Sequence, residues 1–416
     1  EREGMDLPLL IGGATTSRIH TAVKIDPNYN RGQAIYVTDA GRAVGVASRL
    51  MSEGQRAPYF AEVREEYTKI AEDHANSRGG AKRVSIEAAR DNRLQPDFAS
   101  NPPAKPNLLG TKTFEDFPLE ELVPVIDWTP FFATWEIKGQ YPAVLRDNRY
   151  GPAATALYND ARRMLDEIVE KKLLTARGVA GIWPAASRGD DIVVFNGEER
   201  ASEEATFYSL RQQMARMRGG RANLALSDFV APESSGIADY IGGFAVTAGH
   251  GEDELAARYA SEGDDYNKIL SQALADRLAE AFAEKLHQIV RTDLWGYASG
   301  ENLANEDLIA EKYQGIRPAP GYPAQPDHTE KETLFRLLGA EEATGIRLTE
   351  SFAMAPGSSV SGLYFSHPES HYFGVGKIER DQVADYAVRK GWDLALAERW
   401  LAPILNYDPH RMEAAE

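Results

Sequence analysis

The stretch 315–331 carries residue types that could hold a small polar ligand. Each proline in it fixes its own φ and pushes the preceding residue toward extended geometry, so neither a helix nor a central strand fits here. Arg317, Tyr322 and His328 would then stand on a stiff wall, and such loops often present specific ligand groups. The alternative, a proline-rich connector between two helices, stays equally open. The prolines are Pro318, Pro320, Pro323 and Pro326.

A single carboxylate, Asp127, stands within an aromatic stretch at 125–135. One interpretation is that Asp127 caps the next helical turn, a common use of Asp. The other is that it lies in a pocket of low dielectric constant, where a carboxylate favours a cationic partner.

The strongest helix is predicted over 264–295, where apolar residues recur at helical spacing. Glu280, Glu284 and His287 share its other face, and Glu284-x-x-His287 has the spacing used in carboxylate di-iron bundles. No second such pair occurs on another helix, so a solvated face with Glu280 at a pocket edge is the favoured interpretation. His367 and His371 flank a proline turn and are interpreted as a hairpin tip rather than a metal pair.

The first 52 residues show a strand, a glycine-rich turn, a helix, a strand and a helix, which is typical of the end of a doubly wound α/β unit. Ligands of such sheets lie beyond the carboxyl ends of the strands, so Gly12, Gly13 and the turn around Ala40 are candidate contacts. Such turns also serve only to pack a helix on a sheet, and this packing role is the favoured interpretation. The missing strands are expected upstream of residue 1, which predicts a C-terminal piece of a longer protein.

The remaining chain predicts a charged helix at 57–73, a linker at 74–110 with a short strand or turn near 84–86, and a second domain at 111–416. That domain mixes strands and helices without strict alternation, which indicates an α+β fold with a partly antiparallel sheet. Strands are expected at 178–185, 192–195, 222–230, 240–248, 346–350, 360–366 and 372–378, and helices at 152–174, 203–217, 328–338, 381–390 and 393–400.

Composition limits the function classes. The net charge is -17, from 46 basic and 63 acidic residues, and without a basic block this argues against nucleic acid as the main partner. There is no cysteine, so a disulfide, a thiolate nucleophile and a thiolate zinc site are excluded. No apolar run approaches the ~20 residues that span a bilayer. A reducing, cytoplasmic compartment fits these features.

Several common motifs are absent. The sequence has no G-x-S-x-G elbow, no P-loop, no H-E-x-x-H and no G-x-G-x-x-G after a strand. If the chain binds S-adenosylmethionine, it does so without the glycine-rich loop of ordinary Rossmann methyltransferases.

Five long segments carry a family resemblance. They are 126–132 (IDWTPFF), 265–269 (DYNKI), 275–284 (ADRLAEAFAE), 315–331 (GIRPAPGYPAQPDHTEK) and 361–368 (SGLYFSHP). Together they closely resemble the C-terminal activation domain of cobalamin-dependent methionine synthases, over about 111–409. The segment 9–46 looks like the last part of the cobalamin-binding domain of the same family. The resemblance therefore implies an α/β remnant of a doubly wound cobalamin-binding domain (1–73), a linker (74–110) and an α+β activation domain with a mainly antiparallel sheet and a long helix.

In that family the cobalamin is occasionally oxidised to an inactive cob(II)alamin. The activation domain then presents S-adenosylmethionine, a flavodoxin-type protein supplies an electron, and the cobalt is methylated again. The resemblance implies that Asp127 faces the amino group of the methionine moiety, Arg317 its carboxylate and Glu280 the pocket edge. It also implies that the backbone at Ala319, Pro320 and Gly321 follows the ligand, with Tyr322 beside the sulfonium and Tyr372 and Phe373 near the adenosine. Ala40 matches a cobalamin contact, and no catalytic residue is nominated, because methyl transfer needs mainly proximity and orientation.

The sequence departs from the whole family in what it lacks. The D-x-H-x-x-G segment with the cobalt-ligating histidine, the zinc-binding homocysteine module and the folate module are absent. The fragment is therefore expected to work with upstream modules and not to make methionine alone. Gln140 and Phe373 stand where some relatives have Lys and Tyr. The alternative function is a non-catalytic module that senses S-adenosylmethionine and controls domain arrangement.

Overall fold

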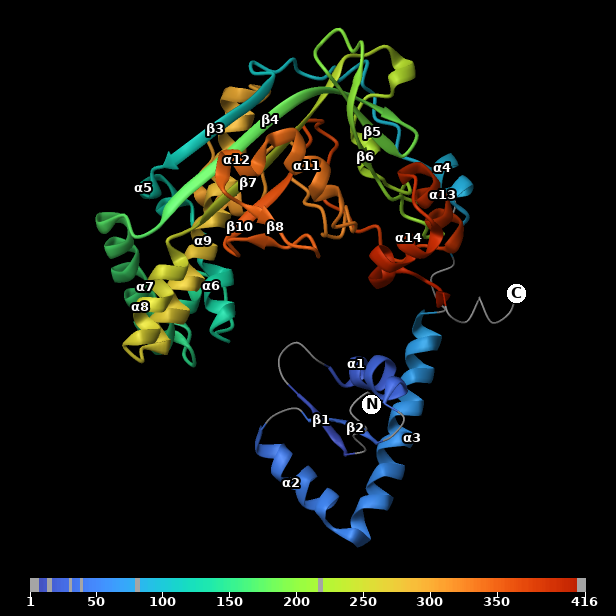
Figure 1. Cartoon of the computed structure of the whole chain (residues 1–416), viewed down its shortest axis with the longest axis vertical. Coiled ribbons are helices and arrows are strands. Elements are labelled where there is room, and N and C mark those ends of the chain that lie inside the picture. Colours follow the sequence, from blue (N-terminus) through green and yellow to red (C-terminus); the bar gives the residue numbers. More distant parts are fainter. Residues whose placement is uncertain are drawn as a thin grey trace. The chain divides into compact units, whose positions relative to one another are not determined.

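The structure, a computed structural model, describes residues 7–12, 17–29, 32–37, 40–78, 83–215 and 220–409. The chain divides into two compact units, Glu1–Arg83 and Val84–Glu416 (Figure 1). Each unit has hydrophobic clusters of its own, so each is described by itself.

In its described residues, the first unit has two parallel strands and three α-helices. Strand β1 pairs with β2 in parallel, with Ile11 opposite Tyr36, and the Tyr67 hydroxyl accepts a hydrogen bond from the Tyr36 N–H at 2.8 Å. Its core includes Ile35, Leu50 and Val63. A parallel pair with a helical connection is the arrangement expected of a doubly wound unit. The elements are β1 Leu9–Ile11, α1 Arg18–His20 with a π turn Thr21–Ile25, β2 Ala34–Tyr36, α2 Ala40–Met51 and α3 Glu53–Arg78.

The second unit is built on a six-stranded sheet in which every pair is antiparallel. The strand order is β10-β7-β4-β5-β6, and β3 pairs with the first part of β4. A separate two-stranded ribbon, β8–β9, lies outside this sheet. The strands are β3 Gly110–Phe117, β4 Thr175–Arg188, β5 Asp191–Phe195, β6 Glu203–Tyr208, β7 Asp239–His250, β8 Arg347–Leu348, β9 Met354–Ala355 and β10 Ser359–Tyr364.

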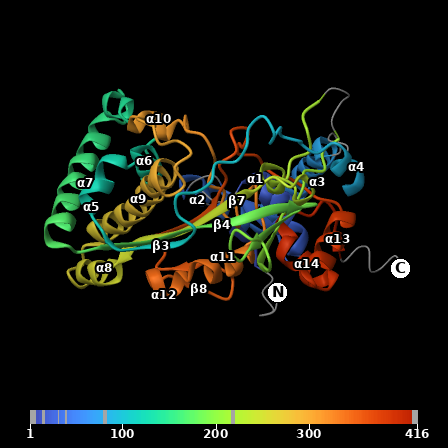
Figure 2. The same cartoon turned by 90° about the horizontal axis from the view of Figure 1, so that it is seen from above.

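Helices cover both faces of this sheet. Figure 2 shows α7 and α9 on one side of β3, β4 and β7, and α11 and α12 on the other. Alternate residues of a strand point to opposite faces; in β7, Phe244 belongs to the cluster under α9, whereas Ala245 belongs to the cluster under α11. The helices are α4 Ile86–Asp91, α5 Leu119–Leu122, α6 Trp128–Thr134, α7 Gly151–Lys171, α8 Glu252–Ser261, α9 Asp265–Ile289, α10 Asn305–Ile309, α11 Glu330–Leu338, α12 Ala340–Thr344, α13 Arg380–Lys390 and α14 Leu394–Leu401.

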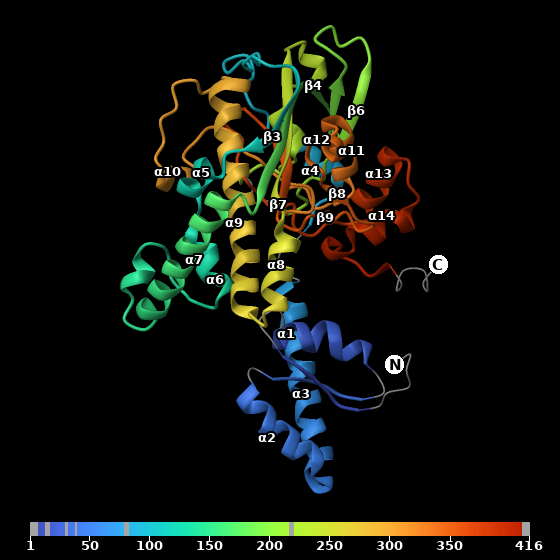
Figure 3. The same cartoon turned by 60° about the vertical axis from the view of Figure 1, so that its left-hand side comes forward.

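The long helix α9 lies close against the sheet and runs beside α8 (Figure 3). It continues into a π turn at Val290–Leu294. A Cβ at Gly178 of β4 would lie 2.8 Å from the Phe282 ring of α9, and a Cβ at Gly243 of β7 would lie 2.6 Å from Leu334 of α11. Glycine at these two positions therefore lets one helix approach each face of the sheet.

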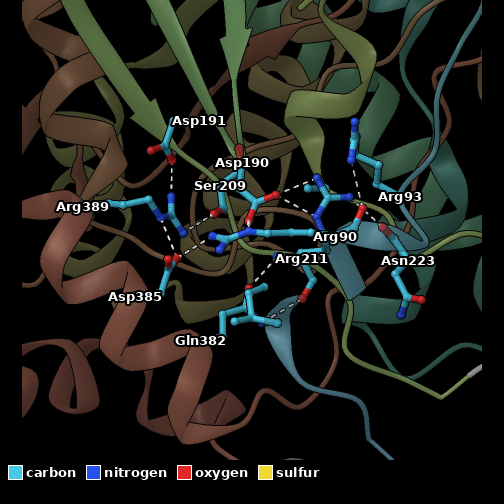
Figure 4. Close-up of polar contacts among 12 residues, drawn as sticks. Arg90, Arg93, Asp190, Asp191, Ser209, Arg211, Asn223, Gln382, Asp385 and Arg389 are labelled. Carbon is cyan, nitrogen blue, oxygen red and sulfur yellow. Dashed lines mark hydrogen bonds and ion pairs between the residues drawn. The ribbon is translucent and has the colours of Figure 1, made fainter. Parts of the chain in front are cut away.

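A buried ion-pair network connects α13 and α4 to one end of the sheet (Figure 4). Arg211, whose side chain is fully buried, donates to Asp190 at 2.7 Å and to both oxygens of Asp228 at 2.8 Å. Arg90 of α4 donates to Asp190 and to Asp385 of α13, each at 2.7 Å. Although burial alone would raise the pKa of the Asp190 carboxyl, Arg211 and Arg90 hold it below its usual value.

Much of the segment expected to be a linker is packed into the second unit. The Val84 N–H donates to the Gln213 carbonyl at 3.0 Å, and the Trp295 indole donates to the Ala104 carbonyl at 3.0 Å. Together with the Arg90 ion pairs, these bonds place 84–110 within the unit that begins at Val84. Near 84–86 the chain forms no strand; Ser85 caps α4.

Most predicted elements are present, and the mainly antiparallel α+β fold is confirmed, but three segments differ. The helix predicted over 203–217 is wrong, because 203–208 pairs with β5 as strand β6. The strand predicted over 222–230 is wrong, since it contains a 3-10 turn at Leu226–Phe229. The strand predicted over 372–378 is also wrong: this segment forms no ladder and makes one backbone–backbone hydrogen bond to the proline-rich loop, from the Val375 N–H to the Pro323 carbonyl at 2.8 Å.

Candidate ligand-binding site

A cavity of about 640 Å³ opens along the proline-rich loop. The loop supplies one wall, from Arg317 to Ala324, and β10 supplies another, from Ser359 to Ser361. The volume suits a small organic ligand. Of the residues predicted to meet a ligand, the cavity contains Glu280, Arg317, Ala319, Pro320, Tyr322, Tyr372 and Phe373.

The loop has a fixed position because backbone hydrogen bonds join it to β10, the edge strand of the sheet. Ile316 and Phe365 exchange two backbone hydrogen bonds, at 3.1 and 3.0 Å, and the Pro318 carbonyl accepts from the Leu363 N–H at 2.8 Å. These bonds satisfy polar groups of β10 that an edge strand would otherwise leave unpaired. The loop is therefore both stiffened by proline and fixed to the sheet.

Gly321 forms the turn inside this loop. Its φ is +95°, which favours glycine, and a Cβ there would lie 2.3 Å from the His328 ring. Its N–H donates to the Gln325 carbonyl at 2.7 Å. Gly321 itself does not line the cavity; it shapes the turn that does.

Arg317 is the central charged group of the cavity. Its Nη2 lies 2.7 Å from a Glu284 oxygen, and its Nη1 donates to the Tyr313 hydroxyl at 2.6 Å and to His287 Nδ1 at 3.3 Å. Its backbone N–H donates to the Tyr372 hydroxyl at 3.0 Å. Burial alone would lower the pKa of the guanidinium, but Glu284 and the surrounding phenols raise it, so Arg317 is a permanent cation.

The face of α9 that was expected to be solvated lies buried behind Arg317, so that interpretation is wrong for two residues. Glu284 is 9% exposed and His287 is fully buried, its ring stacked on Tyr364 at 4.9 Å. Burial raises the pKa of the Glu284 carboxyl, partly offset by Arg317 and Arg291. Burial and the same two arginines lower the pKa of His287 well below its ordinary value, so the ring is neutral.

The other predicted side chains lie around the opening. Glu280 of α9 is exposed at the cavity edge, as the sequence predicted. Tyr322 is 64% exposed and Tyr372 is 40% exposed, so both rings are partly available to a ligand. Phe373 packs its ring edge against Phe229, with centroids 6.2 Å apart.

Asp127 does not line this cavity. It is the N-cap of α6, and its Oδ1 accepts a hydrogen bond from the Thr129 N–H at 2.9 Å. The capping interpretation is therefore confirmed, and a ligand contact at Asp127 stays a prediction.

The remaining histidine candidates have local structural partners. His328 lies just before α11 with its Nδ1 3.0 Å from Lys331 Nζ. His367 Nδ1 accepts from the Glu369 N–H at 3.2 Å, and His371 Nδ1 lies 2.8 Å from the Glu369 carbonyl. Within the described part of the chain, no group of three or more His, Asp or Glu side chains is placed to hold a metal ion.

Two charged residues of the cavity were missed by sequence reasoning. Glu311 lies in a turn with φ +52° and faces the same cavity as Arg317. Lys331, only 6% exposed, lines the cavity from α11, and burial lowers its pKa. Both flank the proline stretch, but nothing in their spacing distinguishes them from ordinary surface charges.

The candidate contacts of the first unit can be placed only in part. Gly12 follows β1, and the Val37 N–H donates to the Ile11 carbonyl at 2.8 Å, so the ends of both strands share one edge. A Cβ at Gly12 would lie 3.0 Å from the Val37 carbonyl, which is the packing role weighed above. Ala40 begins α2, and Gly13 lies outside the described residues.

A second cavity, of about 600 Å³, lies near the turn between β4 and β5. It contains none of the predicted site residues, and Arg90, Asp190 and Asp228 on its wall are already paired with one another or with Arg211. The loop cavity is therefore the better candidate, because Arg317 and other predicted site residues line it.

The fold and the cavity define an α+β ligand-binding domain with a rigid proline-rich wall and a permanent cation. Residues 118–391 match the family described as the vitamin B12 dependent methionine synthase activation domain. The chain belongs to this family. It is also similar to a solved structure described as the MetH reactivation domain bound to AdoHcy, with 54% sequence identity, a TM-score of 0.76 and coverage of 78% of this chain and 99% of that one.

None of the helices that the structure describes has the length and apolar character needed to cross a membrane.

Proposed function

We propose that this chain binds S-adenosylmethionine in the loop cavity and serves as the reactivation module of a cobalamin-dependent methionine synthase, a methyltransferase of methionine biosynthesis. The observation that carries this proposal is the Arg317 guanidinium, held on a proline-stiffened wall of a cavity of about 640 Å³. The similar reactivation domain, which has S-adenosylhomocysteine bound, supports the choice of ligand.

The cavity has the charges that an amino acid zwitterion requires. The ligand carboxylate would accept hydrogen bonds from Arg317, since guanidinium and carboxylate match in geometry. The ligand ammonium would face Glu280 and Glu311 at the same opening, with Asp127 as the further predicted contact. A carboxylate-rich rim also suits the positive sulfonium.

The loop backbone and the aromatic rings would hold the rest of the ligand. In the described part of the chain, the Ala319 N–H makes no hydrogen bond and can donate to a ligand beside Pro320. Tyr322 would lie beside the sulfonium, where an aromatic face stabilises a cation. Tyr372 and Phe373 would contact the adenosine.

Cobalamin would be shared between this unit and other parts of the enzyme. The first unit offers parallel strand ends at one edge, with Gly12, Gly13 and Ala40 as the proposed contacts; this fits the last part of a doubly wound cofactor domain. When bound, cobalamin supplies the cobalt that accepts an electron and a methyl group. Zinc would belong to a homocysteine module of the enzyme, the electron donor would be a flavodoxin-type protein, and the other modules of the enzyme would be partners in the cytoplasm.

Isothermal titration calorimetry of the purified chain with S-adenosylmethionine and S-adenosylhomocysteine tests the binding step. We expect saturable binding of one ligand per chain, and absence of binding at millimolar ligand would refute the proposal. The reactivation step is tested on the enzyme with its complete cobalamin domain, reduced flavodoxin and methyl-labelled S-adenosylmethionine. Label that binds but never reaches cobalt would favour the sensing module instead.

A further inference from the structure

The buried polar groups behind the cavity leave one edge of the Arg317 guanidinium open. A guanidinium has five N–H donors. In the hydrogen bonds of the described residues, the two on Nη1 point to Tyr313 and His287, while Nη2 forms an ion pair with Glu284 at 2.7 Å. Among the described residues, Nε–H makes no hydrogen bond, and a carboxylate accepts from Nε–H and one Nη2–H side by side.

Each of the three partners is itself held in place. The buried His287 ring stacks on the Tyr364 ring, with an angle of 15° between the two ring planes. Since Nδ1 accepts from Arg317, the proton of the neutral ring lies on Nε2. Tyr313 is buried, and the Arg291 guanidinium lies over its ring at 4.0 Å. Glu284 stands on the long helix α9, with Arg291 3.9 Å from its other oxygen.

Arg291 is already neutralised by another carboxylate. Its Nε and Nη2 donate to the two oxygens of Glu301 at 2.8 and 2.7 Å. Glu284 is therefore the carboxylate dedicated to Arg317, whereas Glu301 is dedicated to Arg291. The two carboxylates are a matched pair: both are buried and both are held by an arginine, but only one of them touches the cavity cation.

We propose that Glu284, together with Tyr313, is a positioning residue that clamps Arg317 so that its Nε–Nη2 edge faces the carboxylate of the ligand. This inference rests on the proposed function and adds residues that act on the ligand only through Arg317. Without the clamp, the long side chain of Arg317 would have to be ordered by the ligand itself, which weakens binding.

The test compares two ligands and two matched variants by calorimetry. The ligands are S-adenosylhomocysteine and its decarboxylated analogue, which lacks the group that Arg317 would hold. Glu284→Gln keeps the volume and an acceptor oxygen but removes the charge from Arg317, and Glu301→Gln makes the same change at Arg291. We expect Glu284→Gln to bind S-adenosylhomocysteine about tenfold more weakly than the parent chain does. Its affinity for the analogue should stay within about twofold of the parent value. Glu301→Gln should bind both ligands with the affinities of the parent.

Equal weakening for both ligands would show a merely structural role and overturn the inference, as would unchanged or tighter binding of S-adenosylhomocysteine. If Glu284→Gln does not fold, Tyr313→Phe tests the same clamp, because it removes only the hydroxyl that accepts from Arg317. Its expected effect is a smaller loss with the same dependence on the ligand carboxylate, and an unchanged affinity overturns the inference. Failure of the parent chain to bind S-adenosylhomocysteine would instead refute the proposed function, and the clamp with it.

Discussion

Replacing Arg317 by alanine should have two separable effects, one on ligand binding and one on stability. The ligand carboxylate would lose charge-assisted hydrogen bonds worth about 1.5–3 kcal/mol, which corresponds to about 10- to 150-fold weaker binding. The substitution also removes the cation 2.7 Å from the buried Glu284 carboxylate. Leaving a buried charge without its partner costs about 3 kcal/mol of unfolding free energy, lessened here because Arg291 remains 3.9 Å away.

The stability effect should depend on pH, and its sign follows from Glu284. Burial already raises the pKa of the Glu284 carboxyl in the folded state, and loss of Arg317 raises it further. A carboxyl whose pKa is higher in the folded than in the unfolded state binds its proton more tightly when the protein is folded. The ionised carboxyl therefore lowers the free energy of unfolding at high pH, and this loss disappears as the pH falls toward about 4.3. The free energy of unfolding of Arg317→Ala should therefore be lowered, relative to the parent, by more at about pH 8 than at about pH 5.

Calorimetry measures the first effect, and urea denaturation at the two pH values measures the second. Arg336→Ala is the control, because Arg336 is an exposed arginine of α11 whose carboxylate partner, Glu204, lies 3.6 Å away. We expect that control to bind the ligand like the parent. Unchanged affinity of Arg317→Ala would remove Arg317 from the site, and a stability difference independent of pH would refute the reasoning about Glu284.

Three further predictions concern the loop and the packing around it. Gly321→Ala should lower the free energy of unfolding by about 1–3 kcal/mol and weaken ligand binding, because φ is +95° and the new Cβ would collide with His328. Denaturation and calorimetry measure the two effects, and values equal to those of the parent would contradict the close packing. Arg211→Ala should cost about 3–5 kcal/mol in urea denaturation, since it leaves the buried Asp228 carboxylate without its arginine and Asp190 with Arg90 alone. A loss below about 1 kcal/mol would argue against the network in Figure 4. Burial raises the pKa of Glu330 to about 7 despite Lys390, so the free energy of unfolding should fall as the pH rises from about 4.5 to 7. Glu330→Gln should remove this pH dependence, measured by urea denaturation across that range. An unchanged slope would show that Glu330 is not the titrating group.

The sequence was a good guide to the cavity wall, because proline acts locally. Four prolines restrict their own backbone and that of their neighbours wherever the loop lies in space. The loop does line the cavity, and a ligand contact along it stays a prediction. Glu280 was likewise expected at a pocket edge, and it is among the residues that line the cavity.

Long-range pairing decided the segments that were predicted wrongly. The residues 203–208 were read as helix, yet β5 supplies a hydrogen-bonding partner, and pairing across a sheet outweighs weak local preference. The stretch up to residue 110 was predicted as a linker because it is polar and broken by glycines and prolines. Arg90 instead meets Asp190 and Asp385, which lie far along the chain.

The sequence by itself determined the periodic and stiff parts of this protein: the long helix α9, the strands β4 and β7, and the proline-rich loop, since these depend on spacing or on the backbone of single residues. Only the tertiary structure decided that Glu284 and His287 are buried. A polar face on a helix looks solvated in a sequence, and it becomes an interior clamp only when an arginine from a distant loop arrives to pair with it. Burial of charge depends on that partner, which no local pattern contains.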